Sequence, residues 1–444
     1  MILIYRITGM LNLNKISKTF FHLIRGFRLH PYFGFVRGHE YLSKKELNFL
    51  KSLIGTSNPS ILLRFEKSFS SLIGNGYSVS FASGRMGFYA LMREIGIKKG
   101  DEVILLGSTC SVMVNAILRA EATPIYADID VYTLGSSADN VDRVLTERTR
   151  MIVAQHSFGI PCDIERIALL AKTKDIFLLE DCALTVGSTL NGITCGNFGD
   201  AALFSTDHTK PINTLIGGLI YTRDFNLHLA LKKVQSESSL LSIKREKSLW
   251  NQLLLERKFC NPRSYGKMRL MQIIYSRIFG WTKNAFVADD DGTTISSCNP
   301  YPAKIPTFLA ALGIYEVKRW KRIAISRKKT LKDLLGSLRD AFGADVSIYQ
   351  DKTRNIIPLR LALVPKSQKI RNKLSSVVDV DATWFLKPIV STNEPLENFG
   401  YQEGACLKSE EIGRSIINLP CNISLEETTK LKLSLIQEFK LYEN

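Results

Sequence analysis

Between residues 77 and 222 the chain alternates short apolar runs with stretches of helical periodicity, and this alternation constrains the fold more than any other feature. The apolar runs lie at residues 78–83, 102–107, 123–128, 150–155, 176–181, 201–206 and 217–222. Helical spacing occurs between several of them, near residues 86–95, 111–120 and 163–173. Continuous apolar runs are typical of strands that are buried on both faces. We therefore predict an α/β fold with a mostly parallel, seven-stranded type of sheet and helices on both of its faces.

The segments on either side of this region differ from it in composition, which divides the whole chain into four predicted parts. Residues 1–38 hold six Lys or Arg and no acid, with apolar residues at helical spacing, which predicts a basic amphipathic helix. Residues 39–224 form the large α/β domain. Residues 225–300 read as a basic helical insertion, and residues 301–444 as a smaller C-terminal α+β domain. The first segment either packs on the protein, which we favour, or lies on an anionic membrane surface.

Composition excludes several classes of protein. The 444 residues are 45% hydrophobic and 23% charged, as in ordinary globular proteins, and the formal net charge of +17 favours an anionic partner. No known nucleic-acid-binding motif accompanies that charge, so we expect no nucleic-acid partner. The eight cysteines form no CxxC pair and only six histidines occur, so we expect no metal site and reduced thiols in the cytoplasm. No apolar stretch approaches the roughly 18 residues of a membrane span, and the first residues do not resemble a secretory signal.

Chemically useful residues follow the predicted strands. The turn Ser83–Arg85 opens a helix and offers backbone N–H groups, a hydroxyl and a guanidinium to a phosphate. Asp181 ends the run 176–181, Lys210 follows the run 201–206, and His156 directly follows the run 150–155. Singly, each has an ordinary interpretation as a cap, a loop acid, a solvated lysine or a structural histidine. The carboxyl ends of parallel strands meet at one edge, however, and a phosphate site, an acid and a lysine in that order indicate a pyridoxal phosphate site.

Several longer stretches make this interpretation more specific. They include SFASGRMGFYAL at residues 80–91, FLLEDCALTVGS at residues 177–188 and GNFGDAALFSTDHTK at residues 196–210. On these motifs the chain resembles the DegT/StrS family of sugar aminotransferases, which have the aspartate aminotransferase-like fold, called fold type I. The resemblance runs from about residue 35 to the C-terminus, except for residues 225–297.

The resemblance implies roles for individual residues. Lys210 would bind pyridoxal 5′-phosphate covalently and then move protons, and Asp181 would pair with the pyridine nitrogen. Ser205, together with Ser83, Gly84 and Arg85, would bind the cofactor phosphate. Members of the family take an amino group from glutamate and transfer it to a nucleotide-linked keto-sugar for polysaccharide or lipopolysaccharide (O-antigen) synthesis. They act as homodimers whose two sites share residues.

The chain departs from the family pattern around the expected pocket. Arg85 stands where threonine is usual, Cys110 where an aromatic residue stacks on the cofactor ring, and Leu184 where a glutamine contacts the ring hydroxyl. Residues 215–218 and 302–304 also differ from the usual Gly-Glu-Gly-Gly and Asn-Tyr-Arg. Cys110 and Leu184 remain expected cofactor neighbours. The expected substrate-binding residues are His156, His208 and Lys304.

Two other functions stay open on the sequence alone. Some relatives are deoxysugar dehydratases that use pyridoxamine phosphate and carry histidine in place of the lysine. Lys210 argues against that reaction, whereas His208, two residues earlier, keeps it open. The departures around the pocket would also suit a non-catalytic binding or regulatory module, but the retained Lys210 and Asp181 argue against it.

Overall fold

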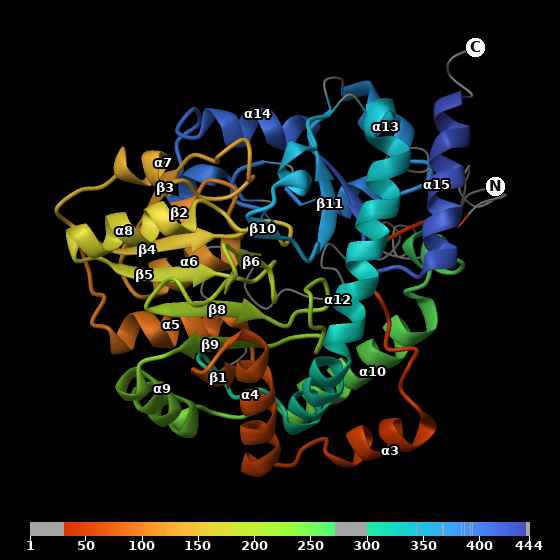
Figure 1. Ribbon diagram of the computed structural model, residues 1–444. Helices are drawn as coiled ribbons and strands as arrows, with labels where there is room; N and C mark the ends of the chain where they lie inside the picture. Colours follow the sequence, from red (N-terminus) through yellow and green to blue (C-terminus); the bar gives the residue numbers. More distant parts are fainter. Residues whose placement is uncertain are drawn as a thin grey trace, which may run out of the picture.

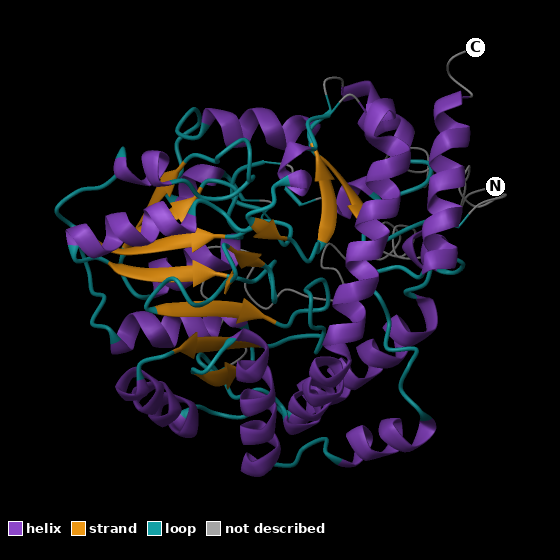
Figure 2. Ribbon diagram, in the orientation of Figure 1, coloured by secondary structure: helices purple, strands orange, loops and turns teal. Residues whose placement is uncertain are grey.

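A seven-stranded sheet forms the centre of the larger part of the molecule (Figure 2). The computed structural model describes residues 31–270, 300–342, 344–365, 368–382, 384–385, 387–390, 392 and 394–440. The spatial order of the strands is β1 (Tyr77–Phe81), β9 (Gly218–Thr222), β8 (Ala201–Ser205), β5 (Phe177–Asp181), β4 (Thr149–Gln155), β2 (Glu102–Leu106) and β3 (Thr123–Ala127). Only β9 runs against its neighbours in this sheet, so the mostly parallel α/β sheet predicted from the sequence is confirmed.

Both faces of the sheet are buried, because neighbouring residues of each strand enter different apolar clusters. Val103 and Val153 pack on the face that carries α4 (Pro59–Ile73), α5 (Gly84–Glu94) and α6 (Ser111–Arg119). Ile104 and Ile152 pack on the other face, with residues of α7 (Ala138–Asp142) and α8 (Ile164–Lys174). The side chains of a strand alternate between faces, so continuous apolar runs are what two covered faces require.

The C-terminal part forms a second, smaller body around a long helix. Helix α12 (Thr307–Phe342) packs on α4 near its start and on α15 (Leu425–Lys440) further along (Figure 1). Beside it lie the antiparallel strands β11 (Arg360–Leu363) and β12 (Ile417–Pro420), with α13 (Gln368–Leu374) and α14 (Leu407–Ser415). This body has its own apolar cluster, which includes Leu334, Leu361, Leu419 and Leu431.

Shorter elements complete the described chain. They are α3 (Lys44–Ser52), β6 (Thr189–Leu190), β7 (Ile193–Thr194), α9 (Phe225–Glu237), α10 (Ile243–Phe259), η1 (Ser347–Gln350), β10 (Arg354–Asn355), η2 (Val380–Ala382) and η3 (Leu396–Phe399). Helices α9 and α10 occupy part of the segment expected to be a basic helical insertion, and residues 271–299 of that segment lie outside the described residues. So does most of the expected N-terminal amphipathic helix, at residues 1–30. Among the described helices, none combines the length and apolar character that a membrane crossing requires.

The aromatic core beneath β8 offers a direct test of this fold. Phe69 of α4 is fully buried, with its ring 5.1 Å from that of Phe204 in an edge-to-face contact. We expect Phe69→Ala to lower the free energy of unfolding by about 3–5 kcal/mol, since it leaves a cavity in a packed core. Urea unfolding followed by circular dichroism measures this. The control Phe49→Ala, on the exposed side of α3, should change it by less than about 1 kcal/mol, and equal effects of the two variants would contradict the packing.

Candidate active site

The end of β1 and the start of β9 meet at the edge of the sheet where the parallel strands end. A Cβ atom placed on Gly218 would lie 2.3 Å from Cα of Gly84, so the chain needs glycine at residue 218 to let the two backbones approach. Gly218 also pairs with Ser205, the last residue of β8. The structure therefore brings Ser83, Gly84 and Ser205 together, as the sequence predicted for a phosphate site.

Ser83 has the position of a helix cap without acting as one. It precedes α5 with extended backbone angles, but its side chain accepts no hydrogen bond from the helix. Its Oγ is buried and has no hydrogen-bond partner in the part of the chain that the structure describes. Buried hydroxyls in folded proteins are usually paired, so this oxygen is available to a ligand at the N-terminus of α5. Arg85, the next residue but one, is half-buried, and its carbonyl accepts a hydrogen bond from the Tyr301 hydroxyl.

Asp181 ends β5 with a buried carboxylate that has few partners. Its Oδ1 accepts a hydrogen bond of 2.9 Å from the backbone N–H of Ala183, and no described cation lies within 4.0 Å of it. Burial raises the pKa of Asp181, while the Ala183 N–H and the Lys210 ammonium oppose that rise. The site thus holds a carboxylate whose charge a bound cation would stabilise.

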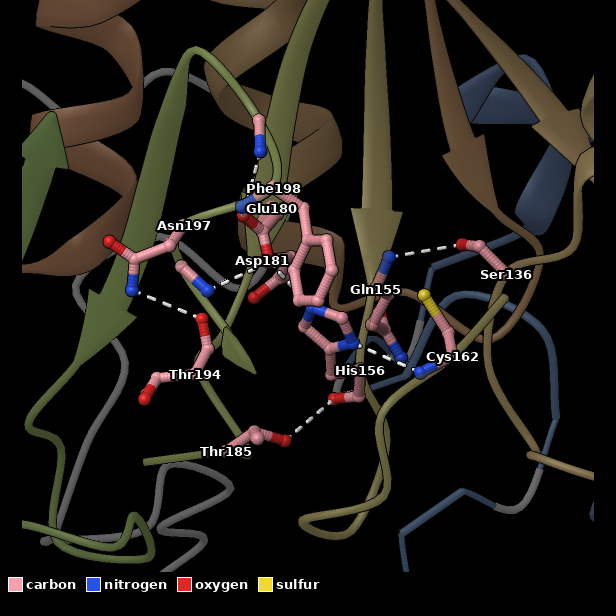
Figure 3. Close-up of polar contacts among 12 residues, drawn as sticks. Ser136, Gln155, His156, Cys162, Glu180, Asp181, Thr185, Thr194, Asn197 and Phe198 are labelled. Atoms are coloured by element: carbon pink, nitrogen blue, oxygen red, sulfur yellow. Dashed lines mark hydrogen bonds and ion pairs between the residues drawn. The ribbon is translucent and has the colours of Figure 1, made fainter. Parts of the chain in front are cut away.

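Glu180, one residue earlier, points to the opposite face of β5. Its carboxylate accepts hydrogen bonds from the backbone N–H groups of Gly196, Phe198 and Gly199, at 2.6–2.8 Å. The His156 ring lies between Glu180 and Cys162 (Figure 3). Nδ1 of His156 accepts from the Cys162 N–H at 3.0 Å, so Nε2 carries the proton that it donates to Glu180, also at 3.0 Å. The side-chain polar atoms of Glu180 and His156 are therefore all used in hydrogen bonds that hold this part of the fold together.

This buried cluster faces away from Asp181. Because strand side chains alternate, Glu180 and Cys182 share one face and Asp181 lies on the other. The ligand-type atoms of His156, Glu180 and Cys182 lie within 4.8 Å of one another, but the hydrogen bonds of the first two leave no free acceptor pair for a metal ion. Burial also raises the pKa of the Cys182 thiol and keeps it protonated. His156 is fully buried, and both of its ring nitrogens are already hydrogen-bonded within the protein, so neither is available to a substrate.

Lys210 lies in the loop that joins β8 to β9. Its backbone N–H donates to the Asp207 carbonyl at 2.9 Å, and Thr206 N–H donates to the Gly217 carbonyl at 2.9 Å, which closes the loop. The Lys210 side chain is half-buried, and its Nζ lies 5.1 Å from the ring centre of Trp384. Trp384 comes from the C-terminal part, so two bodies of the molecule meet at this lysine.

The other two expected cofactor neighbours lie after β2 and β5. Cys110 precedes α6, is half-buried and pairs as an isolated bridge with Val390 of the C-terminal part. Leu184 is buried three residues after Asp181. Together with Ser83, Asp181, Ser205 and Lys210, they place the expected cofactor residues at the ends of four strands of one sheet edge, β1, β2, β5 and β8.

His208 is held by an acid that the sequence analysis did not assign to the site. Its Nδ1 lies 3.1 Å from Oε1 of Glu256, a fully buried residue of α10. The same carboxylate accepts from the side-chain amides of Gln252, at 2.8 Å, and Asn213, at 3.5 Å. Burial lowers the pKa of His208, but the carboxylates of Asp207 and Glu256 outweigh it, so that the pKa is raised.

Lys304, the third expected substrate-binding residue, forms its described hydrogen bonds with residues outside the candidate site. Its ammonium donates to the Ser236 carbonyl at 2.8 Å, and its backbone N–H donates to the Ser239 carbonyl at 2.9 Å. These contacts tie residues 303–304 to the connection between α9 and α10. The described contacts therefore do not bring Lys304 to Lys210.

Comparison with known proteins places these residues in a family. The model of the DegT/DnrJ/EryC1/StrS aminotransferase family matches residues 47–432. GDP-perosamine synthase of Escherichia coli O157:H7 is 35% identical over 173 residues, which are 39% of this chain and 48% of that protein. UDP-N-acetyl-3-dehydro-alpha-D-glucosamine 3-aminotransferase of Acidithiobacillus ferrooxidans is 31% identical over 38% of this chain and 46% of its own length. These matches thus span less than half the length of each relative.

Solved structures extend the likeness over nearly the whole fold. Helicobacter pylori PseC, an aminotransferase involved in the biosynthesis of pseudoaminic acid, matches with a TM-score of 0.68 and 18% identity over 93% of this chain and 100% of its own. The E. coli GDP-4-keto-6-deoxy-D-mannose-3-dehydratase matches with a TM-score of 0.66 and 20% identity over 92% and 100%. At this identity the two structures establish the fold.

The buried Asp181 carboxylate makes the stability of the ligand-free protein depend on pH. A carboxyl whose pKa is raised by folding costs stability once the pH exceeds its unfolded pKa, near 4, and the cost is complete above the folded pKa. Asp181→Asn should therefore raise the melting temperature of cofactor-free protein at pH 7, and the gain should vanish as the pH falls to about 4. Differential scanning fluorimetry between pH 4 and 8 measures this.

Asp139 provides the control of opposite sign. The exposed Asp139 is hydrogen-bonded to Arg166, which lowers its pKa, so Asp139→Asn should not raise the melting temperature at any pH. A gain for Asp181→Asn that does not change with pH would contradict the buried-charge account.

The Glu256 contacts predict that α10 supports the lysine loop. Glu256→Leu should lower the free energy of unfolding by about 3–5 kcal/mol, because it leaves buried donors of His208, Gln252 and Asn213 without an acceptor. Glu256→Gln keeps one acceptor oxygen and should cost about 1–3 kcal/mol. Urea unfolding provides the values, with the exposed Glu237→Leu as control. A cost below 1 kcal/mol for Glu256→Leu would show that this network does not hold the loop.

Proposed function

Since the chain belongs to the DegT/DnrJ/EryC1/StrS aminotransferase family, we propose that it is a pyridoxal-phosphate-dependent sugar aminotransferase. It transfers an amino group, with glutamate as the donor, to a keto-sugar carried on a nucleotide. The product serves the synthesis of a cell-surface polysaccharide or lipopolysaccharide. Two matched relatives bear the names of nucleotide-sugar enzymes, a GDP-perosamine synthase and a UDP-sugar 3-aminotransferase. The observation that carries the proposal is the buried Asp181 carboxylate, which has no described cation within 4.0 Å and lies at the sheet edge that also holds Lys210.

The residues of this edge fit pyridoxal phosphate. The partnerless Ser83 hydroxyl and the first N–H groups of α5 suit its phosphate, with Ser205 beside them and Arg85 adding positive charge. Asp181 suits a protonated pyridine nitrogen, which would supply the missing cation. Lys210 supplies the amine that binds the cofactor aldehyde. Cys110 and Leu184 would lie against the ring in place of larger or polar residues.

The chain's own groups then have separate tasks. When bound, the cofactor supplies an electron sink for the bonding pair released as the amino group moves. Asp181 holds the proton at the ring nitrogen, and a nearby negative charge is what keeps that nitrogen protonated. Nζ of Lys210 accepts the proton from the carbon that bears the donor amine and returns a proton during the second half of the transfer. Burial on the Asp181 side keeps water from competing for these protons.

The net charge and the family resemblance support our proposals for the acceptor, the oligomeric state and the location of the enzyme. The net charge of +17 favours a diphosphate-bearing sugar nucleotide. The resemblance favours a homodimer with shared sites and a cytoplasmic location. The basic segments 1–38 and 225–285 either pack on the protein or contact an anionic membrane surface, and co-sedimentation with anionic vesicles at low and high salt distinguishes the two.

Lys210 gives the most direct functional prediction. Wild-type protein mixed with pyridoxal phosphate should develop the visible absorption band of a lysine-bound cofactor, and excess glutamate should remove that band. Lys210→Ala should abolish both changes and lower the rate of transamination by at least about 10³-fold, because it removes the covalent link and the proton carrier. Lys408→Ala is the matched control, since Lys408 is exposed and paired with Glu411 on α14.

Each other outcome selects a different function. A band that forms but does not respond to glutamate would favour another donor or dehydratase-type chemistry. A wild-type protein without any band would favour a binding module. Transamination by Lys210→Ala at the wild-type rate would contradict the assignment of the lysine.

A further inference from the structure

Trp384 brings an aromatic ring from the smaller body to the lysine of the larger one. The Nζ atom of Lys210 lies 5.1 Å from the centre of the Trp384 ring, within the range of a cation–π contact. The two residues are far apart in sequence, so this contact depends on how the C-terminal part docks. A ring at this distance borders the space around the reacting nitrogen.

The backbone around Trp384 is anchored on the two-stranded sheet. Trp384 N–H donates to Oδ1 of Asn418 in β12 at 2.9 Å. The Arg360 guanidinium of β11 donates to the same oxygen at 3.2 Å and to the Ala382 carbonyl at 2.9 Å. Phe385, the next residue, is fully buried. The position of the indole ring is thus set by the smaller body rather than by the contact with Lys210.

The same stretch also reaches the loop after β2. Ile389 N–H donates to the Gly107 carbonyl at 3.0 Å, and Val390 N–H donates to the Thr109 carbonyl at 2.7 Å. The chain from Trp384 to Val390 therefore touches the sheet edge at two places, beside Lys210 and beside Cys110. These are the places between which the proposed cofactor and its substrates must lie.

The indole N–H of Trp384 has no partner among the described residues. Its Nε1 is buried and forms no hydrogen bond with any of them, although the backbone of the residue is well anchored. Buried tryptophan N–H groups usually find an acceptor, since an unpaired donor loses its hydration without compensation. The ring contact alone needs only an aromatic face, which phenylalanine would also supply. The unpaired donor therefore calls for a separate explanation.

We propose that Trp384 is a ligand-contacting residue, whose indole N–H donates a hydrogen bond to an oxygen of the molecule that reacts at Lys210. This inference rests on the proposed aminotransferase function. The acceptor is an oxygen beside the reacting nitrogen, and two molecules could carry it, the cofactor or the carboxylate of the amino donor. In the ligand-free protein the indole N–H stays unpaired, which lowers the stability of the folded protein. Ligand binding restores that stability.

Trp384→Phe tests this because it keeps the aromatic face and removes the donor. Three quantities are measured: the melting temperature of cofactor-free protein, the dissociation constant for pyridoxal phosphate from absorbance titration, and the glutamate concentration for half-maximal loss of the cofactor band. We expect an unchanged or higher melting temperature and a weakening of about tenfold or more in one of the two ligand measurements, the size of one hydrogen bond to a ligand oxygen. A weaker pyridoxal phosphate constant assigns the oxygen to the cofactor, and a weaker glutamate response assigns it to the donor.

Trp250→Phe is the matched control, since Trp250 packs on Phe308 in the core, with ring centres 6.4 Å apart. It should lower the melting temperature and leave both ligand measurements within twofold of wild type. The proposal is overturned if Trp384→Phe leaves both ligand measurements within twofold of wild type, or if it lowers the melting temperature as much as Trp250→Phe does. A wild-type protein that binds no pyridoxal phosphate would be a distinct result, which would overturn the proposed function and this inference together.

Discussion

The alternation of side chains at the end of β5 governs the chemistry of this molecule. Glu180 and Asp181 are adjacent, so one carboxylate points to each face of the sheet. Glu180 accepts four hydrogen bonds, three from the backbone of residues 196–199 and one from His156, and so ties the loop before β8 to β4 and β5. Among the described residues Asp181 accepts only the Ala183 N–H, and burial raises its pKa because no described cation lies close enough to offset that rise. Glu180 thus holds together the sheet edge at which Asp181 lies.

Two elements outside the sheet converge on the lysine loop. Helix α10 reaches it through Glu256 and His208, and the smaller body reaches it through Trp384. The loop between β8 and β9 is itself anchored by the fully buried Ile212 and Leu215 and by backbone hydrogen bonds, and these two side-chain contacts add support close to Lys210. A loop supported from both sides suits the proposed role of Lys210, which would have to return to one position after each proton transfer.

The sheet was predictable from the sequence because its signal is local. Apolar runs of strand length with turn residues between them do not depend on distant partners, so the strand positions and the meeting of Ser83, Asp181 and Lys210 at one sheet edge could be predicted from the sequence. Their order along that edge, with Lys210 between Ser83 and Asp181, comes from the strand order of the sheet. His156 could not be placed that way. His156 lies at the end of a strand, much as Asp181 does, so its sequence position also suggested the candidate site. Only the register of β4 with β5 shows that its ring faces Glu180. The role of Glu256 depends on how α10 docks, and its sequence context does not single it out, because it is one of three glutamates among the 12 basic residues of segment 225–285. The stretch from Trp384 to Pro388 also resembles the family, but the contact of Trp384 with Lys210 could not be predicted, because the two residues are 174 positions apart (384 − 210).

The central claim is that the sheet edge around Asp181 captures pyridoxal phosphate on Lys210. Its most direct test is borohydride reduction of the protein incubated with pyridoxal phosphate, followed by peptide mapping with mass spectrometry. The account predicts one stoichiometric cofactor adduct, on the peptide that contains Lys210. An adduct spread over surface lysines, or a single adduct on another lysine, would contradict it.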